Sequence, residues 1–509
     1  MKHVKTSLCL VVALSTVLAA CGGSGSGTEP AASPGTATQA AQKTEAPVEI
    51  SVMVHFFSQQ PMAADNPVKQ AIEKATNSKL NIQWVSSNNY GDKLNVTLAS
   101  GDIPDLTFIN DPFASVVRNM ATQGAFWEIG PYIKDYPNLS KGIPETAWDL
   151  TKMQDGKNYF IPRPRPSEAD SFFIVRKDWL DKLGLKVPST TDELYQVMKA
   201  FAEKDPDGNG KADTVGLTAN TDSLNYVDTA FTGVNGKYKW ANEQITHVAM
   251  LPEYRQSLEF LVKAYKEKLI PADFASMKLT QVNELFQSGK AGMLVEKAGT
   301  MATYYDKLKI IDPNFKQGDF YPVTSINGYN PKGPGFSGTL AISKKVSEDK
   351  LKRILKVLDT WMNPEVFAYN TYGIEGVHHT VKDGQKVLDT EKLQADSVAD
   401  LNQILYVADP YASSTKVSFP KEVNEVYAKI QDERVKTSVA DISIGLYSPT
   451  LIKAGAEQEK KIADLRTKII LGTEPITAWD DYVTKLKGDA DLQKICQELT
   501  EAYKKRMGK

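Results

Sequence analysis

The chain has 509 residues, of which 41% are hydrophobic and 24% are charged. This composition excludes a disordered chain and a bundle of membrane helices, and the length suggests roughly three domains. Lys and Arg total 60 against 62 Asp and Glu, so the formal charge of −2 gives no broad basic surface, and nucleic-acid binding is not expected. Cys9, Cys21 and Cys496 lie too far apart for a disulfide framework or a CxxC metal site.

The first 20 residues have the layout of a secretory signal. Two lysines precede an apolar run from Leu8 to Leu18, which is too short to span a bilayer. Small residues then lead to Cys21 in the sequence LAACG, which resembles a bacterial lipobox, where the cysteine is acylated and becomes the first mature residue. Ordinary signal cleavage that leaves Cys21 free is the alternative. We predict a lipoprotein signal peptide over residues 1–20 and lipidation at Cys21.

Residues 21–47 have the composition of a flexible tether. From Gly22 to Pro47 there is no large apolar side chain, and Gly, Ser, Thr, Ala and Pro dominate, so burial cannot offset the entropy of ordering. No later run reaches the ~18 uninterrupted apolar residues of a spanning helix. The sequence therefore predicts a soluble, monomeric body that a lipid anchor alone holds at the outer face of the bacterial cell membrane.

The body begins with a pattern typical of an α/β sheet. Apolar alternation predicts strands over 50–54, 80–84 and 106–109, and helical spacing predicts helices between them. The order strand, helix, strand, helix, strand indicates parallel pairing. Because ligands bind beyond the carboxyl ends of such strands, the segment from His55 to Ser58 and the pair Asn110-Asp111 are the first site candidates.

A proline-broken segment, IPRPRP over 161–166, is expected to cross to a second body, because regular structure cannot accommodate its prolines. The pattern then restarts with a predicted strand over 172–175 and a helix over 178–183. Longer helical patterns follow over 252–267, 349–362 and much of 421–470.

A calcium loop is predicted at residues 205–213. Oxygen-bearing side chains stand at loop positions 1, 3, 5 and 9, the backbone carbonyl of Lys211 would serve at position 7, and Gly210 allows the sharp turn at position 6. Position 12 is Gly216 and not a bidentate Glu, so the loop would be a structural clip and not a sensor. The alternative is an Asp-Gly-Asn turn with solvated charges. The predicted ligands are Asp205, Asp207, Asn209, Lys211 and Asp213.

The stretch from Phe172 to Leu217 resembles extracellular solute-binding proteins of the sugar-binding family 1 class. Further marks of the resemblance are LASGDIPDL at 98–106, GKNYFIP at 156–162, FQSGKAGM at 286–293 and GIEGVHH at 373–379. It covers nearly all of residues 48–509 and is nearest to lipoproteins that feed oligosaccharide importers, some of which carry a calcium loop. Those loops often have an acidic residue after the ninth position, where this chain has Thr214.

The resemblance implies a periplasmic-binding-protein-like α/β fold with two lobes, a hinge and a ligand cleft between them. Hinge closure on a saccharide would present the complex to the permease subunits of an ABC transporter, and no catalysis is expected. The expected organisation places residues 48–162 and 296–335 in the first lobe. The second lobe would then contain residues 163–295, with the calcium loop, and residues 336–509.

Saccharide sites combine aromatic rings for the apolar sugar faces with polar side chains for the hydroxyl rim. The candidate contacts come from loops placed by the resemblance and, for Trp240, from a glycine-rich hairpin, where the alternative is a surface or packing aromatic. The full set is His55, Phe56, Asn110, Asp111, Arg163, Arg165, Trp240, Lys297, Thr300, Phe336, Ser337, Glu375 and His378.

Two groups of candidates keep a second interpretation. Arg163 and Arg165 either pair with uronate carboxylates or brace the hinge. His378 and His379 are adjacent, so they cannot both face one metal from a strand, and a sugar contact or a structural histidine is expected instead.

Two rival functions also remain open. A secreted glycan-processing hydrolase would need two carboxylates about 5 to 10 Å apart across a cleft. The sequence Gly335-Phe336-Ser337-Gly338-Thr339 fails the GxSxG pattern at its last position, and neither HExxH nor a phosphate-binding GxxxxGK[ST] occurs. The second rival is a binder of peptides or other non-sugar solutes on the same scaffold, because a fold does not fix its ligand.

Overall fold

The structure is a computed structural model, and it describes residues 45–168, 170–382, 384–407 and 409–508. The predicted signal peptide, Cys21 and most of the predicted tether lie outside these ranges. Within them, no helix is both long enough and apolar enough to cross a membrane.

The first lobe is built on a five-stranded sheet with the strand order β2-β1-β3-β12-β4. β1 pairs in parallel with β2 and β3, as the sequence predicts, whereas β12 runs antiparallel between β3 and β4. The strands are β1 (Val48–Phe56), β2 (Ser78–Ser86), β3 (Leu106–Ile109), β4 (Phe160–Pro164) and β12 (Phe336–Ile342).

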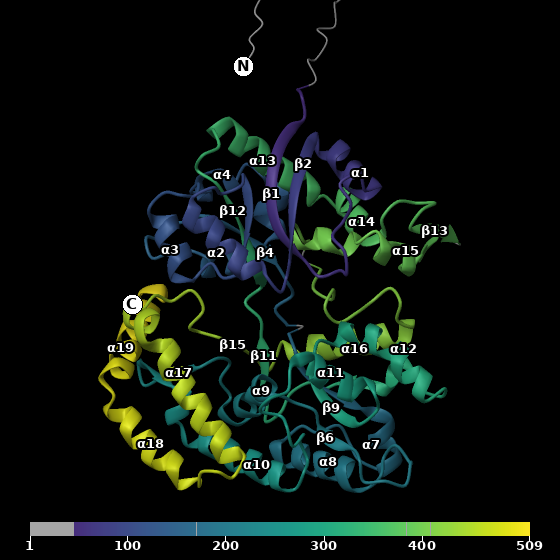
Figure 1. Cartoon of the computed structure of the whole chain (residues 1–509), viewed down its shortest axis with the longest axis vertical. Helices are drawn as coiled ribbons and strands as arrows, with labels where there is room; N and C mark the ends of the chain where they lie inside the picture. Colours follow the sequence, from purple (N-terminus) through teal and green to yellow (C-terminus); the bar gives the residue numbers. More distant parts are fainter. Residues whose placement is uncertain (1–44, 169, 383, 408, 509) are drawn as a thin grey trace, which may run out of the picture. The chain divides into compact units, whose positions relative to one another are not determined.

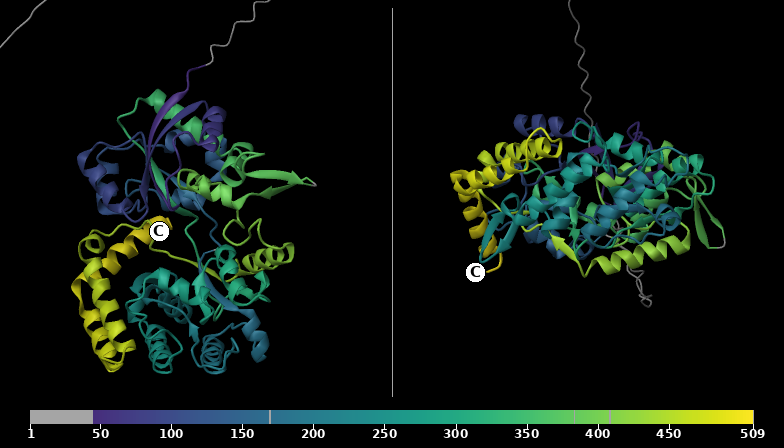
Figure 2. Two further views of the ribbon diagram at one scale, coloured as in Figure 1. Left: turned by 45° about the vertical axis from the view of Figure 1, so that its right-hand side comes forward. Right: turned by 90° about the horizontal axis from the view of Figure 1, so that it is seen from below.

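Helices cover this sheet, and a small hairpin extends from them (Figures 1 and 2). The helix α1 shows the local rules: Asn66 accepts the backbone N–H groups of Val68 and Lys69, and Asn77 ends the helix at a φ of 49°. The elements are α1 (Pro67–Thr76), α2 (Tyr90–Ser100), α3 (Ser115–Thr122), α4 (Gly130–Ile133), α5 (Pro137–Gly142), α6 (Glu145–Leu150), α13 (Glu348–Trp361), α14 (Pro364–Tyr372), α15 (Thr390–Ala395), the 3₁₀ turn η4 (Val398–Gln403), and the hairpin β13 (His379–Lys382) and β14 (Gln385–Leu388).

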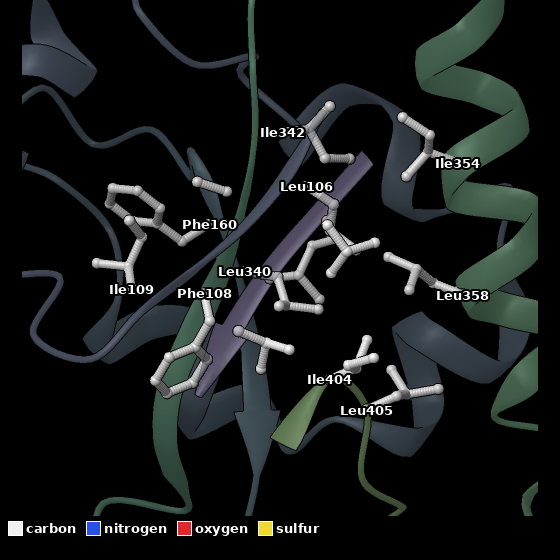
Figure 3. Packing of buried hydrophobic residues seen from close by; sticks show 14 of the residues in the cluster. Leu106, Phe108, Ile109, Phe160, Leu340, Ile342, Ile354, Leu358, Ile404 and Leu405 are labelled. Atoms are coloured by element: carbon white, nitrogen blue, oxygen red, sulfur yellow. The ribbon is translucent and has the colours of Figure 1, made fainter. Parts of the chain in front are cut away.

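The core of the first lobe joins segments that are far apart in the sequence. Leu106 of β3 and Leu340 of β12 pack with Ile354 and Leu358 of α13, and Ile404 closes the cluster from the segment that follows η4 (Figure 3). All five side chains are at most 2% exposed. Residues 336–405 therefore belong to the first lobe.

The second lobe has a four-stranded sheet with the order β10-β5-β9-β6, in which only β6 and β9 pair in parallel. Its elements up to residue 332 are β5 (Phe172–Arg176), α7 (Lys177–Leu183), α8 (Thr191–Glu203), β6 (Val215–Leu217), α9 (Thr221–Thr232), β7 (Tyr238–Ala241), β8 (Gln244–His247), η1 (Val248–Met250), α10 (Pro252–Lys266), α11 (Leu279–Gln287), β9 (Ala291–Glu296), η2 (Ala298–Thr300), α12 (Met301–Ile311), η3 (Gln317–Asp319), β10 (Phe320–Pro322) and β11 (Asn330–Lys332).

The C-terminal part completes the second lobe. Ile462 and Ile469 of the longest helix pack into the core of that lobe, and the hairpin β7–β8 packs on the last helix. The elements are α16 (Lys421–Arg434), β15 (Ser438–Ala440), α17 (Pro449–Ile470), α18 (Thr477–Gly488) and α19 (Ala490–Arg506).

The structure corrects the expected lobe boundaries. Segment 296–335 lies in the second lobe, because β10 pairs with β5, and segment 336–405 lies in the first lobe, because β12 pairs with β3 and β4. The first crossing follows Pro164 at the end of β4. The strands β10 and β12 each pair with strands more than 100 positions away in the sequence. Periodicity indicates that a segment is a strand but not which distant strand it pairs with, so the sequence could not predict these boundaries.

Candidate ligand-binding site

The chain crosses between the lobes three times. The first crossing follows Pro164 at the end of β4, the second leads through Gly335 into β12, and the third begins at Tyr406. Hydrogen bonds hold the first two crossings side by side. The backbone N–H of Arg165 donates to the carbonyl of Gly335 at 2.9 Å, and the N–H of Gly333 donates to the carbonyl of Ser167 at 2.7 Å. On the third crossing, the Tyr406 ring packs against the side chain of Arg165. The guanidinium carbon of Arg165 lies 3.8 Å from the centre of that ring. The first crossing therefore contacts both of the others where the chain passes between the lobes.

A hydrogen-bonded network joins three of the predicted site residues. Arg163 donates through Nε to the carbonyl of Ser337 at 2.9 Å and through Nη1 to Oε1 of Gln403 at 2.6 Å. The same Gln403 oxygen lies 3.0 Å from Nε2 of His55. Since this oxygen can only accept, Nε2 of His55 carries the proton. Gln403 is the residue that unites the network, and the sequence analysis missed it.

Burial keeps the His55 imidazole neutral. The side chain is 7% exposed, and burial, followed by the nearby charge of Arg163, lowers the pKa of His55 to about 4. Burial also lowers the pKa of Arg163 well below its usual value, although the guanidinium donates to three backbone carbonyls and one amide oxygen. The network thus combines a neutral imidazole with a guanidinium, a group that stays protonated in proteins.

The carboxyl ends of β1 and β3 present an exposed aromatic ring and polar groups. Phe57 is 68% exposed, its ring centre lies 4.9 Å from that of His55, and its N–H donates to Asp400 at 2.9 Å. The predicted Phe56 is half-buried, so Phe57 is the ring that faces outward. Asn110 and Asp111 are exposed beyond β3, as the sequence predicts.

On the second lobe, the turn after β9 lies against the third crossing. The N–H of Gly299 donates to the carbonyl of Ser413 at 2.8 Å. Lys297 at the start of this turn lies 3.9 Å from Asp170, and Thr300 at its end is half-buried. The predicted Lys297 and Thr300 therefore lie on an element that contacts the segment following Tyr406.

Other predicted contacts have packing roles in the structure. The buried Phe336 ring lies 6.4 Å from Phe113, and the half-buried Trp240 ring lies 5.1 Å from Tyr503 of α19. His378 is fully buried, with Nε2 2.9 Å from Asp396 and Nδ1 accepting the N–H of Ile374. Glu375 is exposed next to it. For His378 the contacts favour the structural interpretation over a sugar contact.

A separate cavity of about 840 Å³ lies within the second lobe, between α9, β8 and α17. Two pairs of ionisable side chains stand in its wall. Asp228 and Arg466 form a buried ion pair at 2.9 Å, and His247 lies 2.9 Å from Glu459. None of the predicted ligand contacts lines this cavity.

In the predicted calcium loop, the ammonium group of Lys290 contacts two of the carboxylates. Nζ of Lys290 lies 3.1 Å from Asp207 and 2.8 Å from Asp213, and these contacts lower the pKa of Asp213 and raise that of Lys290. Asn209 donates its amide to the same two carboxylates. Within the described ranges, no three His, Cys, Asp or Glu side chains are close enough to share a metal ion.

The loop nevertheless keeps features of a cation-binding turn. The Asp205 carboxylate accepts the N–H groups of Asn209 and Gly210, both at 3.0 Å, and Gly210 has the positive φ of 77° that the sharp turn requires. Position 12 has no room for a ligand side chain, since a Cβ on Gly216 would lie 2.5 Å from the backbone of Met198. The donor set therefore fits a hard cation with fewer protein ligands than a full EF-hand, provided that Lys290 withdraws.

These features define a two-lobed binding protein with its lobes joined by three crossings. The sequence profile described as bacterial extracellular solute-binding protein matches residues 58–371, and the chain belongs to this family. The polygalacturonan/rhamnogalacturonan-binding protein YtcQ of Bacillus subtilis (strain 168) is 33% identical, with 97% of each chain covered. Lipoprotein LipO of the same organism is 29% identical over 89% of this chain and 93% of its own.

A solved structure supports the fold. It is the EF-hand mutant of the S. pneumoniae ABC-transporter substrate binding protein FusA in complex with fructo-nystose. It superposes with a TM-score of 0.66 at 20% identity and covers 91% of this chain and all of its own. At this identity the similarity shows the fold alone.

Proposed function

We propose that this protein captures an oligosaccharide outside the cytoplasm and delivers it to the permease subunits of an ABC transporter. The observation that carries this proposal is the exposed Phe57 ring, placed beyond β1 beside the neutral His55 and the hydrogen-bonded Arg163. An exposed aromatic face beside fixed polar groups suits a sugar, which has apolar faces and a hydroxyl rim. Two relatives support the same class of ligand: YtcQ is a polygalacturonan/rhamnogalacturonan-binding protein, and FusA is a fructooligosaccharide ABC transporter substrate-binding protein.

Isothermal titration calorimetry with matched panels of oligosaccharides and peptides tests the ligand class. We expect binding of at least one oligosaccharide and of no peptide, and a Phe57→Ala variant that binds at least 10-fold more weakly because a stacked ring is lost. Val426→Ala is a control, since Val426 is also exposed but lies on α16. Binding of peptides alone would favour the non-sugar alternative.

We infer further that the saccharide is released unaltered. The family consists of binding proteins, and the residues assembled here offer hydrogen bonds and an aromatic face to a ligand. Chromatography of oligosaccharides after prolonged incubation with the protein should return them intact. Shortened products that disappear with a variant of one cleft carboxylate would establish the hydrolase alternative.

Ligand-driven closure of the lobes is part of the proposal. Outside the crossings, the lobes also touch where Arg118 donates to the carbonyl of Leu446 at 3.3 Å. Small-angle scattering should show a smaller radius of gyration when saccharide is bound. An unchanged radius at saturating ligand would exclude hinge closure.

We propose lipid anchoring through Cys21 at the outer face of the membrane. The support is the lipobox in the sequence and the relative named lipoprotein LipO. Mass spectrometry of the native protein should find an acylated Cys21 at the mature N-terminus, and Cys21→Ser should move the protein from the membrane fraction to the medium. An unmodified cysteine would support ordinary signal cleavage.

We propose that the loop 205–213 binds calcium in competition with Lys290. Asp205, Asp207, Asn209, the carbonyl of Lys211 and Asp213 would hold the ion, and the cation would tie the loop to β6. The existence of an EF-hand mutant of FusA supports a calcium loop at this fold.

The expected signature is a change in calcium dependence. In Lys290→Met, calcium should raise the melting temperature by several degrees more than in the wild type, because the competing ammonium group is gone. Asp205→Ala should abolish the calcium response in either background. Equal melting temperatures of Lys290→Met in calcium and in chelator would refute the metal assignment.

A further inference from the structure

Arg163 and Arg165 are two positions apart but have different environments. The Arg163 side chain is 5% exposed and makes four hydrogen bonds, all to groups of the first lobe at Ser337, Asn402 and Gln403. These bonds hold the residue just before the first crossing against β12 and against the end of η4. Arg163 therefore has the contacts of a hinge brace.

Arg165 has unused hydrogen-bonding capacity. Its side chain makes one hydrogen bond to a described residue, from Nη1 to the carbonyl of Pro164 at 2.8 Å. One face of the guanidinium is covered by Tyr406, and the side chain as a whole is half-buried. Nε and Nη2 have no acceptor among the described residues, and these two groups form the edge that matches a carboxylate.

The neighbouring carboxylates are engaged elsewhere. Glu168 lies 2.9 Å from Lys332, Asp170 lies 3.9 Å from Lys297, and Asp409 accepts the N–H of Tyr411. No carboxylate of a described residue lies within 4 Å of Arg165. Burial lowers the pKa of Arg165 to about 10, so the group is still charged at neutral pH.

A second cation lies on the third crossing, which contacts Arg165 through Tyr406. Lys416 is exposed, and its stem packs over Gly299, where an added Cβ would lie 2.8 Å from Cε of Lys416. Its Nζ donates to the carbonyl of Ala412 at 2.8 Å and is in no ion pair with a described carboxylate. The third crossing thus carries Lys416, and Arg165 of the first crossing lies against its start at Tyr406.

We propose that the captured saccharide is acidic, and that a uronate carboxylate binds the Nε and Nη2 edge of Arg165 while Tyr406 holds the guanidinium in place. Lys416 adds attraction for a second carboxylate further along the ligand. This inference rests on the proposed function, because it names the class of saccharide at that site. A half-buried arginine held by an aromatic face is preorganised for a bidentate contact, so little side-chain entropy is lost on binding.

Calorimetry with matched ligands tests this inference. The ligands are trimers of galacturonate and of mannuronate, each with its carboxyl-reduced neutral counterpart of the same length. We expect the wild type to bind at least one uronate trimer about 10- to 100-fold more tightly than its reduced counterpart, because charge-assisted hydrogen bonds to one carboxylate are lost on reduction. The preference should weaken as salt is raised.

Variants locate the preference at Arg165. Arg165→Gln should lose most of the preference, measured as the ratio of the two affinities, and Arg165→Lys should keep part of it, since the charge remains and the planar fork is lost. Lys344→Gln is the matched control, because Lys344 also lies over an aromatic ring, 3.0 Å from the centre of Trp127, but on the first lobe away from the crossings. It should retain the full preference.

The outcomes separate the two proposals. Equal binding of uronate and reduced trimers, or binding of neutral oligosaccharides alone, would overturn the acidic ligand and leave the proposed function standing. If no saccharide binds, the proposed function itself fails. If Arg165→Gln does not fold, the wild-type comparison between each trimer and its reduced counterpart, together with Arg165→Lys, still decides the question.

Discussion

The guanidinium of Arg165 lies against the ring of Tyr406, 3.8 Å from its centre, although the two residues are separated by more than 200 positions. Arg165 is on the first crossing and Tyr406 is on the third, so the contact joins two of the segments that form the hinge. The second crossing is tied to the first through Gly335. The same contact that positions the proposed carboxylate receptor therefore also holds the hinge together.

Replacing Tyr406 by Leu should destabilise the protein by roughly 1–2 kcal/mol, because a half-desolvated cation–π contact is lost. Tyr406→Phe keeps the ring and should stay within about 0.5 kcal/mol of the wild type. Urea unfolding with both variants measures the difference. Equal stability of the Leu and Phe variants would show that the stack contributes nothing to the hinge.

His55 should make the protein less stable as the pH falls. Its pKa is lowered in the fold from 6.5 to about 4, so the unfolded chain takes up a proton that the folded chain excludes. The contribution of His55 to the free energy of unfolding is complete above pH 6.5 and falls as the pH drops towards 4. The total loss is about 3 kcal/mol. His55→Gln, which can keep the bond to Gln403, should remove this part of the slope in unfolding measured from pH 7 to 4.

The buried pair of Asp228 and Arg466 should tolerate joint replacement better than single replacement. The side chains are 7% and 4% exposed, burial raises the pKa of Asp228, and Arg466 opposes that rise. Arg466→Met should cost about 3–5 kcal/mol because it leaves a buried carboxyl without its counter-charge. Adding Asp228→Leu to it should recover much of the loss.

Exposed ion pairs provide the control for that experiment. Arg255 pairs with Glu259 and Asp480, and its side chain is 34% exposed. Arg255→Met should cost less than about 1 kcal/mol. If Arg466→Met is no more destabilising than Arg255→Met, the buried pair is not a structural requirement.

Gly338 should not accept a side chain. Its φ is 68°, and an added Cβ would lie 2.2 Å from the Phe108 ring, at the irregularity where β12 shifts register against β4. Gly338→Ala should therefore cost about 1 kcal/mol for the left-handed backbone plus 1–3 kcal/mol for overpacking. Gly328→Ala, with a φ of 71° and open space, should show the backbone cost alone in thermal unfolding.

Local patterns predicted the elements and the outer parts of the candidate site. The strands over 50–54, 80–84 and 106–109 and the exposed Asn110-Asp111 pair were predictable because alternation and strand ends are properties of neighbouring residues. Phe57 lies in the segment from His55 to Ser58 that the strand end indicated, although Phe56 was the ring named there as a contact. Gln403 and Tyr406 could not be predicted, because each acts through residues of another segment.

The sequence by itself predicted an α/β body behind a lipobox-like segment and a stretch with the composition of a tether, since composition and periodicity are properties of consecutive residues. Tertiary structure alone decided that β12 belongs to the first sheet, that Lys290 contacts the carboxylates of the loop at 205–213, and that Arg163 makes four hydrogen bonds while the side chain of Arg165 makes one to a described residue. The reason is physical: these properties depend on which distant groups satisfy a strand edge or a charge, and that is settled only when the chain packs.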